Sequence, residues 1–163
     1  MTQPTDTDGA TNEIAENSAV GTVVGITALA SDADATNYVV TYSLDDDAGG
    51  RFAIDTFTGE ITTAGAIDYE VASDHTIIVR ASSVDGSSAT QAFIVAVSDL
   101  NDSAPSITQN QFQVTEGQAT VVTAAHFDAS DLDTANVGLQ VTFSQVRGGY
   151  FALSAMPAVP QFS

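Results

Sequence analysis

The sequence of 163 residues predicts an all-β protein built from two tandem antiparallel β-sandwiches, of which the first is complete and the second partial. Three observations lead to this prediction: the residue composition, the alternation of apolar and polar residues in short stretches, and a repeat between the two halves. Val, Ile and Thr favour strands, whereas scarce Leu and absent Lys leave few residues for amphipathic helices. A chain of this length can bury a core in each of two small domains.

The first half contains seven stretches that alternate or are rich in β-branched residues, and Gly, Asp and Ser turns separate them. In chain order the stretches are NEIAE, TVVGITAL, YVVTYSL, RFAID, GEITT, HTIIVRAS and TQAFIVAV. In TFTGEI, Gly59 is expected to take the positive φ of a tight hairpin. Short strands at this spacing favour a Greek-key, immunoglobulin-like sandwich. The predicted strands span residues 12–16, 22–29, 38–44, 51–55, 59–63, 75–82 and 90–97.

The second half repeats landmarks of the first at an offset of about 100 residues. Residues 14–34 align with 114–133, and GGRFAID aligns with GGYFALS. A period of this length indicates separate domains in a tandem array rather than a solenoid. We predict an N-terminal linker over 1–11, a complete repeat over 12–102 and a partial repeat over 103–163. The second repeat lacks about three strands, so either the chain is a piece of a longer protein, which we favour, or strands of a neighbouring chain complete it.

The charge of the chain excludes several kinds of partner. There are 21 acidic residues against three arginines, which gives a net charge of −18. Nucleic acid and anionic membrane surfaces are therefore poor partners, and a cation is the natural ligand. No apolar run reaches 18 residues, so we expect no membrane insertion, and from residues 1–17 we expect no secretory signal. The absence of Cys leaves the redox compartment open.

The linker SDLNDSAP at 98–105 adds more acid between the two predicted domains. It offers carboxylates, an amide oxygen and backbone carbonyls, the ligand types that Ca²⁺ prefers. A short linker is flexible unless something fills the joint. The linker is therefore predicted to bind calcium.

Several motifs together resemble the calcium-binding scheme of cadherin repeats, of the type found in tandem in large bacterial surface proteins. They are Glu16 in IAEN, Asp68 and Glu70 in IDYE, DLND at 99–102 before Pro105, and DLD at 131–133, together with FAIDTFTGEITT at 52–63. The resemblance covers residues 12–105 well and is looser beyond them.

The resemblance implies three ions at the joint. Two would be held by Glu16, Asp68, Glu70, Asp99, the carbonyl of Leu100, and Asp102. A third would be completed by Asn101, Asp131, Asp133 and Asn136. Asp32 and Asp34 would face a preceding joint. Ser103 departs from the family pattern, because it stands where the family's linker usually has a second Asn.

The function that this scheme implies is structural. We predict a calcium-binding repeat of an extracellular bacterial adhesin or biofilm matrix protein, in which Ca²⁺ stiffens the joint between neighbouring repeats. The first alternative is a carbohydrate-binding module that binds polysaccharide, with Tyr38, Tyr69 and Tyr150 as possible contacts despite the absence of Trp. The second is a subunit that assembles with another copy of itself.

No reactive constellation indicates an enzyme. His75 and His126 are isolated, so a strand-edge or surface role is favoured over zinc ligation. The run Asp45-Asp46-Asp47 is expected to form a solvated turn, because Asp hydrogen-bonds its own backbone in such loops.

Overall fold

The computed structural model describes residues 1–33, 39–109, 127–133, 140–146 and 150–156, and the regular elements in these ranges are all strands. Among these residues, no helix is long and apolar enough to cross a membrane. The chain divides into two compact units, Met1–Leu100 and Asn101–Ser163. The predicted domain boundaries stay predictions.

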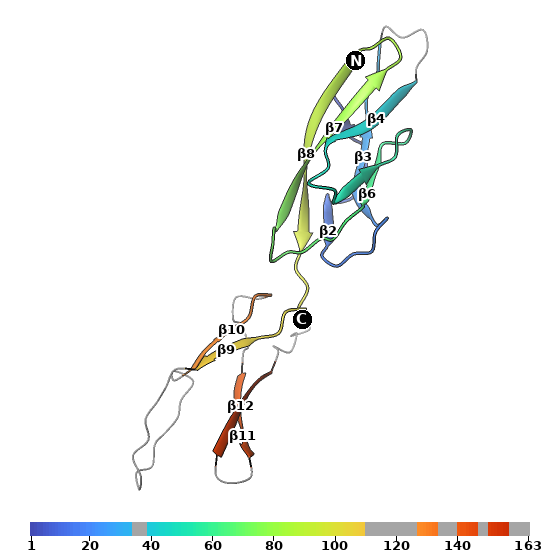
Figure 1. Ribbon diagram of the computed structural model, residues 1–163. Helices are drawn as coiled ribbons and strands as arrows, with labels where there is room; N and C mark the ends of the chain where they lie inside the picture. The colour runs from blue at the N-terminus through green and yellow to red at the C-terminus, as the bar shows by residue number, and fades with distance from the viewer. Residues whose placement is uncertain (34–38, 110–126, 134–139, 147–149, 157–163) are drawn as a thin grey trace. The chain divides into compact units, whose positions relative to one another are not determined.

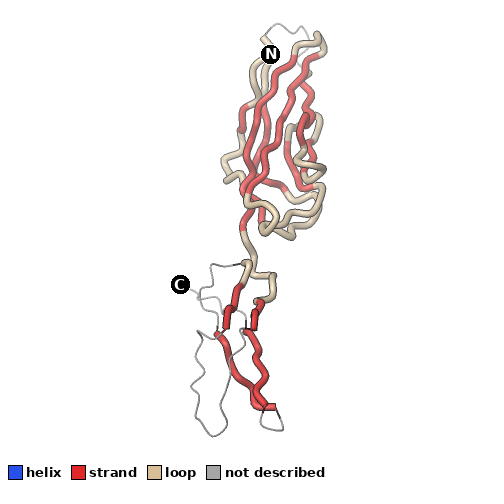
Figure 2. The backbone as a smooth tube through the Cα atoms, turned by 60° about the vertical axis from the view of Figure 1, so that its left-hand side comes forward, coloured by secondary structure: helices blue, strands red, loops and turns tan. Residues whose placement is uncertain are grey.

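The first unit consists of two four-stranded sheets (Figure 1). One has the order β1-β3-β6-β5 and the other β2-β8-β7-β4. Figure 2 shows the strands running along the long axis of this unit. The prediction of an all-β sandwich is confirmed, and each predicted strand of the first copy is present with ends shifted by a few residues. The strands are β1 (Thr5–Asp6), β2 (Glu13–Ala15), β3 (Val23–Leu29), β4 (Val40–Asp46), β5 (Phe52–Ile54), β6 (Glu60–Thr63), β7 (Asp74–Ser83) and β8 (Ser88–Ser98).

The core of the first unit follows from the alternation along its strands. In β7, Ile77, Val79 and Ala81 are fully buried, whereas the residues between them are half-buried on the other face. This period of two is typical of a strand with one face in the core. The opposite sheet contributes Val24, Ile26 and Ile61, and the remaining members are Ile14, Ala28, Ala30, Tyr42, Phe52, Ile67, Val95 and Val97.

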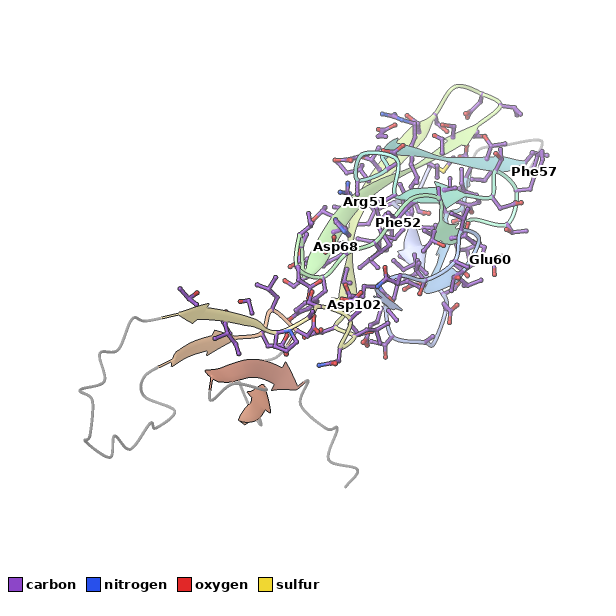
Figure 3. All side chains as sticks on the ribbon, turned by 60° about the horizontal axis from the view of Figure 1, so that its bottom comes forward. Arg51, Phe52, Phe57, Glu60, Asp68 and Asp102 are labelled. Atoms are coloured by element: carbon purple, nitrogen blue, oxygen red, sulfur yellow. The ribbon has the colours of Figure 1, made fainter. Side chains whose placement is uncertain are left out.

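The hairpin between β5 and β6 has the predicted glycine geometry. Gly59 has a φ of 74°, which confirms the expectation of positive φ. The Asp55 carboxylate accepts hydrogen bonds from the backbone N–H groups of Phe57 and Thr58, at 2.9 and 2.8 Å. Phe57 itself is 76% exposed at the outside of the unit, whereas Phe52 points into the core (Figure 3).

Of the three residues in the run Asp45-Asp46-Asp47, two form a turn as predicted. Asp46 and Asp47 accept hydrogen bonds from the backbone N–H groups of Ala48 and Gly50, at 2.9 and 2.7 Å, as expected for turn-forming Asp. Asp45 differs, because both of its carboxylate oxygens accept hydrogen bonds from the Arg80 guanidinium on β7. The pair links β4 to β7, and it lowers the pKa of Asp45.

The N-terminal segment, for which a linker over residues 1–11 is predicted, contains a short strand. β1 pairs antiparallel with β3, with Thr5 opposite Leu29 and Asp6 opposite Ala28. Pro4 is fully buried. The segment contains no long apolar alternation, so its pairing depends on backbone hydrogen bonds that periodicity does not reveal.

The second unit contains two antiparallel ladders among its described residues. β9 (Ser106–Gln109) pairs with β10 (Phe127–Ser130), and β11 (Gln140–Val146) pairs with β12 (Tyr150–Met156). His126, which was expected to lie at a strand edge or surface, lies outside the described residues.

His75 is half-buried and faces the core. It lies opposite Val95 of β8, beyond the part of β7 that pairs with β4, and its ring packs edge-on against Phe52 with 5.8 Å between the ring centroids. Its Nε2 atom is buried without a hydrogen-bond partner among the described residues. Burial lowers the pKa of His75, the positive charge of Arg51 lowers it further, and Asp74 acts in the opposite direction. The folded protein therefore favours the neutral imidazole.

We expect the Tm, measured in chelator, to fall as the pH decreases below about 6.5, the usual pKa of His. The unfolded chain takes up a proton there that folded His75 excludes, so the stability decreases until the pH passes below the lowered pKa of His75. His75→Phe should flatten this pH dependence. Asp45, Asp55 and Asp85 have pKa values below the usual range, so their contributions are lost only at more acidic pH. An unchanged slope in the variant would contradict the assignment to His75.

Candidate metal centre

Three carboxylates meet at the end of the first unit where β8 ends. β2 and β8 pair in parallel, with Ala15 opposite Ser98, so both strands end at the same edge of the unit (Figure 1). Glu16 follows β2 directly and Asp99 follows β8 directly. Glu70 lies in the loop between β6 and β7. One carboxylate oxygen from each of the three lies within 4.8 Å of the others.

Glu16 is the buried member of this carboxylate cluster, with 2% of its surface exposed. Its Oε1 accepts a hydrogen bond from the backbone N–H of Leu100 at 2.7 Å, and its Oε2 accepts one from the backbone N–H of Tyr69 at 2.8 Å. These two bonds, the one from Leu100 first, lower the pKa of Glu16 against the opposing effect of burial. Glu16 is therefore a carboxylate anion at neutral pH.

The spacing of the carboxylate cluster fits a hard divalent cation. Calcium binds oxygen at about 2.3–2.6 Å, so two of its ligands lie at most about 5 Å apart. The oxygens of Glu16, Glu70 and Asp99 satisfy this limit. Glu70 and Asp99 are exposed, which leaves room for water and further oxygen ligands. Three negative charges at this separation repel one another, and a bound cation would remove the repulsion.

Asp68 is not a member of the carboxylate cluster. It is exposed, and its Oδ1 accepts a hydrogen bond from the backbone N–H of Val71 at 3.1 Å. The Asp68 carbonyl also accepts a hydrogen bond from the N–H of Ala72. In this structure Asp68 stabilises the turn that presents Glu70. Its assignment as a calcium ligand stays a prediction.

A second group of predicted ligands lies in the second unit. Asp131 and Asp133 are 8% and 2% exposed. Oxygens of Asp102 and Asp133 lie within 4.8 Å of each other. The backbone N–H of Ser103 donates to Asp133 Oδ2 at 2.7 Å, whereas Asp133 Oδ1 is buried without a hydrogen-bond partner among the described residues. A buried carboxylate oxygen of this kind is suited to a cation.

Asp32 lies at the opposite end of the first unit, near the N-terminus. Its Oδ2 accepts a hydrogen bond from the Ser87 hydroxyl at 2.8 Å, and its Oδ1 lies 3.5 Å from the α-ammonium of Met1. The assignment of Asp32 to a preceding joint stays a prediction. Asp34 and Asn136 lie outside the described residues, and Asn101 is exposed in the second unit.

Sequence reasoning did not find the backbone and hydroxyl groups that hold these carboxylates. The amides of Leu100 and Tyr69, the amide of Ser103 and the hydroxyl of Ser87 each donate to a predicted ligand. Every non-proline residue has a backbone N–H, so the sequence carries no signal for which of them bonds a side chain.

The fold and the carboxylate cluster together define the class of the protein: an antiparallel β-sandwich repeat with a candidate cation site at the edge where its last strand ends. The model of the Cadherin domain family matches residues 10–98. The chain therefore belongs to the cadherin family, whose repeats are non-enzymatic domains. Cadherin repeats are extracellular modules that bind Ca²⁺ at the joints between domains.

Two of the relatives that the chain matches are animal proteins. The chain is 36% identical to human Protocadherin-23 over 106 residues, and 32% identical to mouse Protocadherin Fat 4 over 149 residues. These matches cover 63% and 86% of the chain but only 3% of each relative. The expected bacterial type finds no support among them.

Two solved structures share the fold. The extracellular domain of Protocadherin GammaB4 matches with a TM-score of 0.70 and 21% identity, over 96% of this chain and 26% of that one. Repeats EC22-24 of mouse Cadherin-23 match with a TM-score of 0.65 and 25% identity, over 98% of this chain and 55% of that one.

Proposed function

We propose that this chain is a calcium-dependent structural repeat of an extracellular adhesion protein, and that Ca²⁺ stiffens the linker after β8. The observation that carries the proposal is the carboxylate cluster of Glu16, Glu70 and Asp99, whose oxygens lie within 4.8 Å at the point where the chain leaves the first unit. Calcium would neutralise these charges and bring backbone and side-chain oxygens of the linker into one coordination shell.

Further ligands are proposed on the family's scheme. They are Asp68, the carbonyl of Leu100, Asn101, Asp102, Asp131, Asp133 and Asn136 at this joint, with Asp32 and Asp34 at a preceding one. The burial of Asp131 and Asp133 supports their part in the scheme, because buried carboxylates need a compensating charge or donor. The neighbouring repeats of the same chain are the partners that such a joint implies.

The finer predictions remain open proposals. A bacterial adhesin or biofilm matrix protein stays a prediction, as does assembly with another copy of the chain, although one matched structure is a cis-dimer of protocadherin gammaB7. For polysaccharide binding, Tyr69 is partly buried against the core, which leaves less of its ring for a sugar. Tyr38 and the side chain of Tyr150 lie outside the described parts.

Calorimetric titration of Ca²⁺ into chelator-treated protein is expected to show two or more sites, with a higher Tm in calcium, because a ligand that binds only the folded state stabilises it. Asp99→Asn should weaken binding by at least about tenfold, since it removes a charged ligand of the carboxylate cluster. Asp102→Ala should also weaken it if the site extends along the linker.

Asp46→Asn is the matched control. It makes the same change of charge at an exposed position outside the carboxylate cluster, and Asn keeps the acceptor for the Ala48 N–H. It should leave calcium binding unchanged. No binding at millimolar calcium, or an equal loss in Asp46→Asn and Asp99→Asn, would contradict the proposed function.

A further inference from the structure

We propose that Glu16 has a second role beside its candidate role as a ligand: it is a positioning residue that fixes the backbone next to Glu70 and next to Asp99 without any metal. The ligands Glu70 and Asp99 would then be partly preorganised before calcium binds. The relevance of this role to calcium binding rests on the proposed function. The role itself does not, because the contacts that support it are made between protein atoms.

The side chain of Glu16 joins two segments that are distant in the sequence. Its Oε2 bonds the N–H of Tyr69, which is 53 residues away, and its Oε1 bonds the N–H of Leu100, which is 84 residues away. Tyr69 directly precedes Glu70, and Leu100 directly follows Asp99. Glu70 and Asp99, the exposed members of the carboxylate cluster, therefore each lie next to a residue whose backbone N–H donates a hydrogen bond to Glu16.

The backbone around Glu16 strengthens this arrangement. The N–H of Glu16 donates to the carbonyl of Ser98 at 3.1 Å, which continues the pairing of β2 with β8. The N–H of Asn17 donates to the carbonyl of Ile67 at 3.1 Å, and Asn17 has a left-handed φ of 56°. Both the strand end and the 67–70 loop are thus held by main-chain bonds as well as by the carboxylate.

Hydrogen bonds from amides to a buried carboxylate are stronger than those between neutral groups. With Glu16 only 2% exposed, water competes poorly for its oxygens. Each carboxylate oxygen has two lone pairs, so an amide bond leaves a position for a cation. We infer that chelation of calcium frees the linker only beyond Leu100, and that Glu70 and Asp99 stay near their binding positions.

The test is amide hydrogen exchange on the full chain in chelator. Tyr69 and Leu100 should be protected in the wild type. In Glu16→Gln they should exchange at least about tenfold faster, because the side-chain amide offers one acceptor oxygen and turns an N–H₂ donor toward the other backbone N–H. Glu13→Gln is the matched control: it makes the same charge change at an exposed residue of β2 and should leave both amides protected.

Two further readouts separate positioning from general unfolding. The amides of Ile77 and Val79 in β7 should stay protected in Glu16→Gln. In the wild type, a through-hydrogen-bond NMR coupling should join the Leu100 amide nitrogen to the Glu16 carboxylate carbon, which tests the contact even where the variant does not fold. Rapid exchange of Leu100 and Tyr69 in the chelated wild type, or equal rates in Glu16→Gln, would overturn the inference. Because no calcium is present, a failed calcium titration would refute the proposed function and leave this result standing.

Discussion

Gly59→Ala is expected to lower the free energy of unfolding of the first unit by about 2–5 kcal/mol. Two effects add. Gly59 has a φ of 74°, a region that costs a residue with a Cβ about 1–2 kcal/mol. A Cβ at this position would also lie 2.2 Å from the carbonyl oxygen of Ala28, and overpacking of this kind costs about 1–3 kcal/mol more. The N–H of Ala28 donates to the carbonyl of Gly59, so the overlap would push β3 and β6 apart.

Gly86→Ala separates the two effects. Gly86 has a φ of 90°, but a Cβ there would meet nothing within 4 Å. This control should cost only the conformational part, about 1–2 kcal/mol. Urea denaturation followed by NMR signals of β3 and β6 measures both variants. Equal losses would show that the close approach of Gly59 to Ala28 has no energetic importance.

Ile77→Ala is expected to cost about 2–5 kcal/mol, because it removes a fully buried side chain from the middle of the core and leaves a cavity. Ile77 lies on β7, which pairs with strands on both sides, so the backbone cannot easily close the gap.

Ile78→Ala is the matched control for this prediction. It makes the same change one residue further along β7, where the side chain is half-buried on the other face of the sheet. Its cost should be less than half that of Ile77→Ala in the same denaturation experiment. Similar losses for the two variants would contradict the assignment of the inner face.

Periodicity was sufficient to predict β2 to β8 of the first unit, because residues two apart on a strand share a face. This is why the inner face of β7 was predictable, whereas the positive φ of Gly59 was predictable from the turn residues around it. Periodicity does not report which backbones pair across long distances. The pairing of β1 with β3, and the bond from Arg80 to Asp45, depend on contacts of that kind.

As with the fold, part of the candidate site was predictable from the sequence. The residue types of Glu16, Glu70 and Asp99 indicate a hard cation, and the parallel pairing of β2 with β8 brings two of them together. The sequence could not show that the Asp68 side chain accepts a hydrogen bond within a turn, since turn-forming and metal-binding Asp have the same side chain. Nor could it show that His75 faces the core, because an isolated His fits either face of a strand.

The parallel contact between β2 and β8 also determines how the first unit responds to tension. β2 lies near the start of the unit and β8 is its last strand, so a pull on the two ends draws these neighbours past each other along their length. The bonds from Ala96 N–H to Asn12 and from Glu16 N–H to Ser98 are then loaded in shear, together rather than one after another. A hairpin pulled from its open end would instead unzip bond by bond. We therefore expect the short parallel ladder in this otherwise antiparallel sandwich to resist stretching of the repeat.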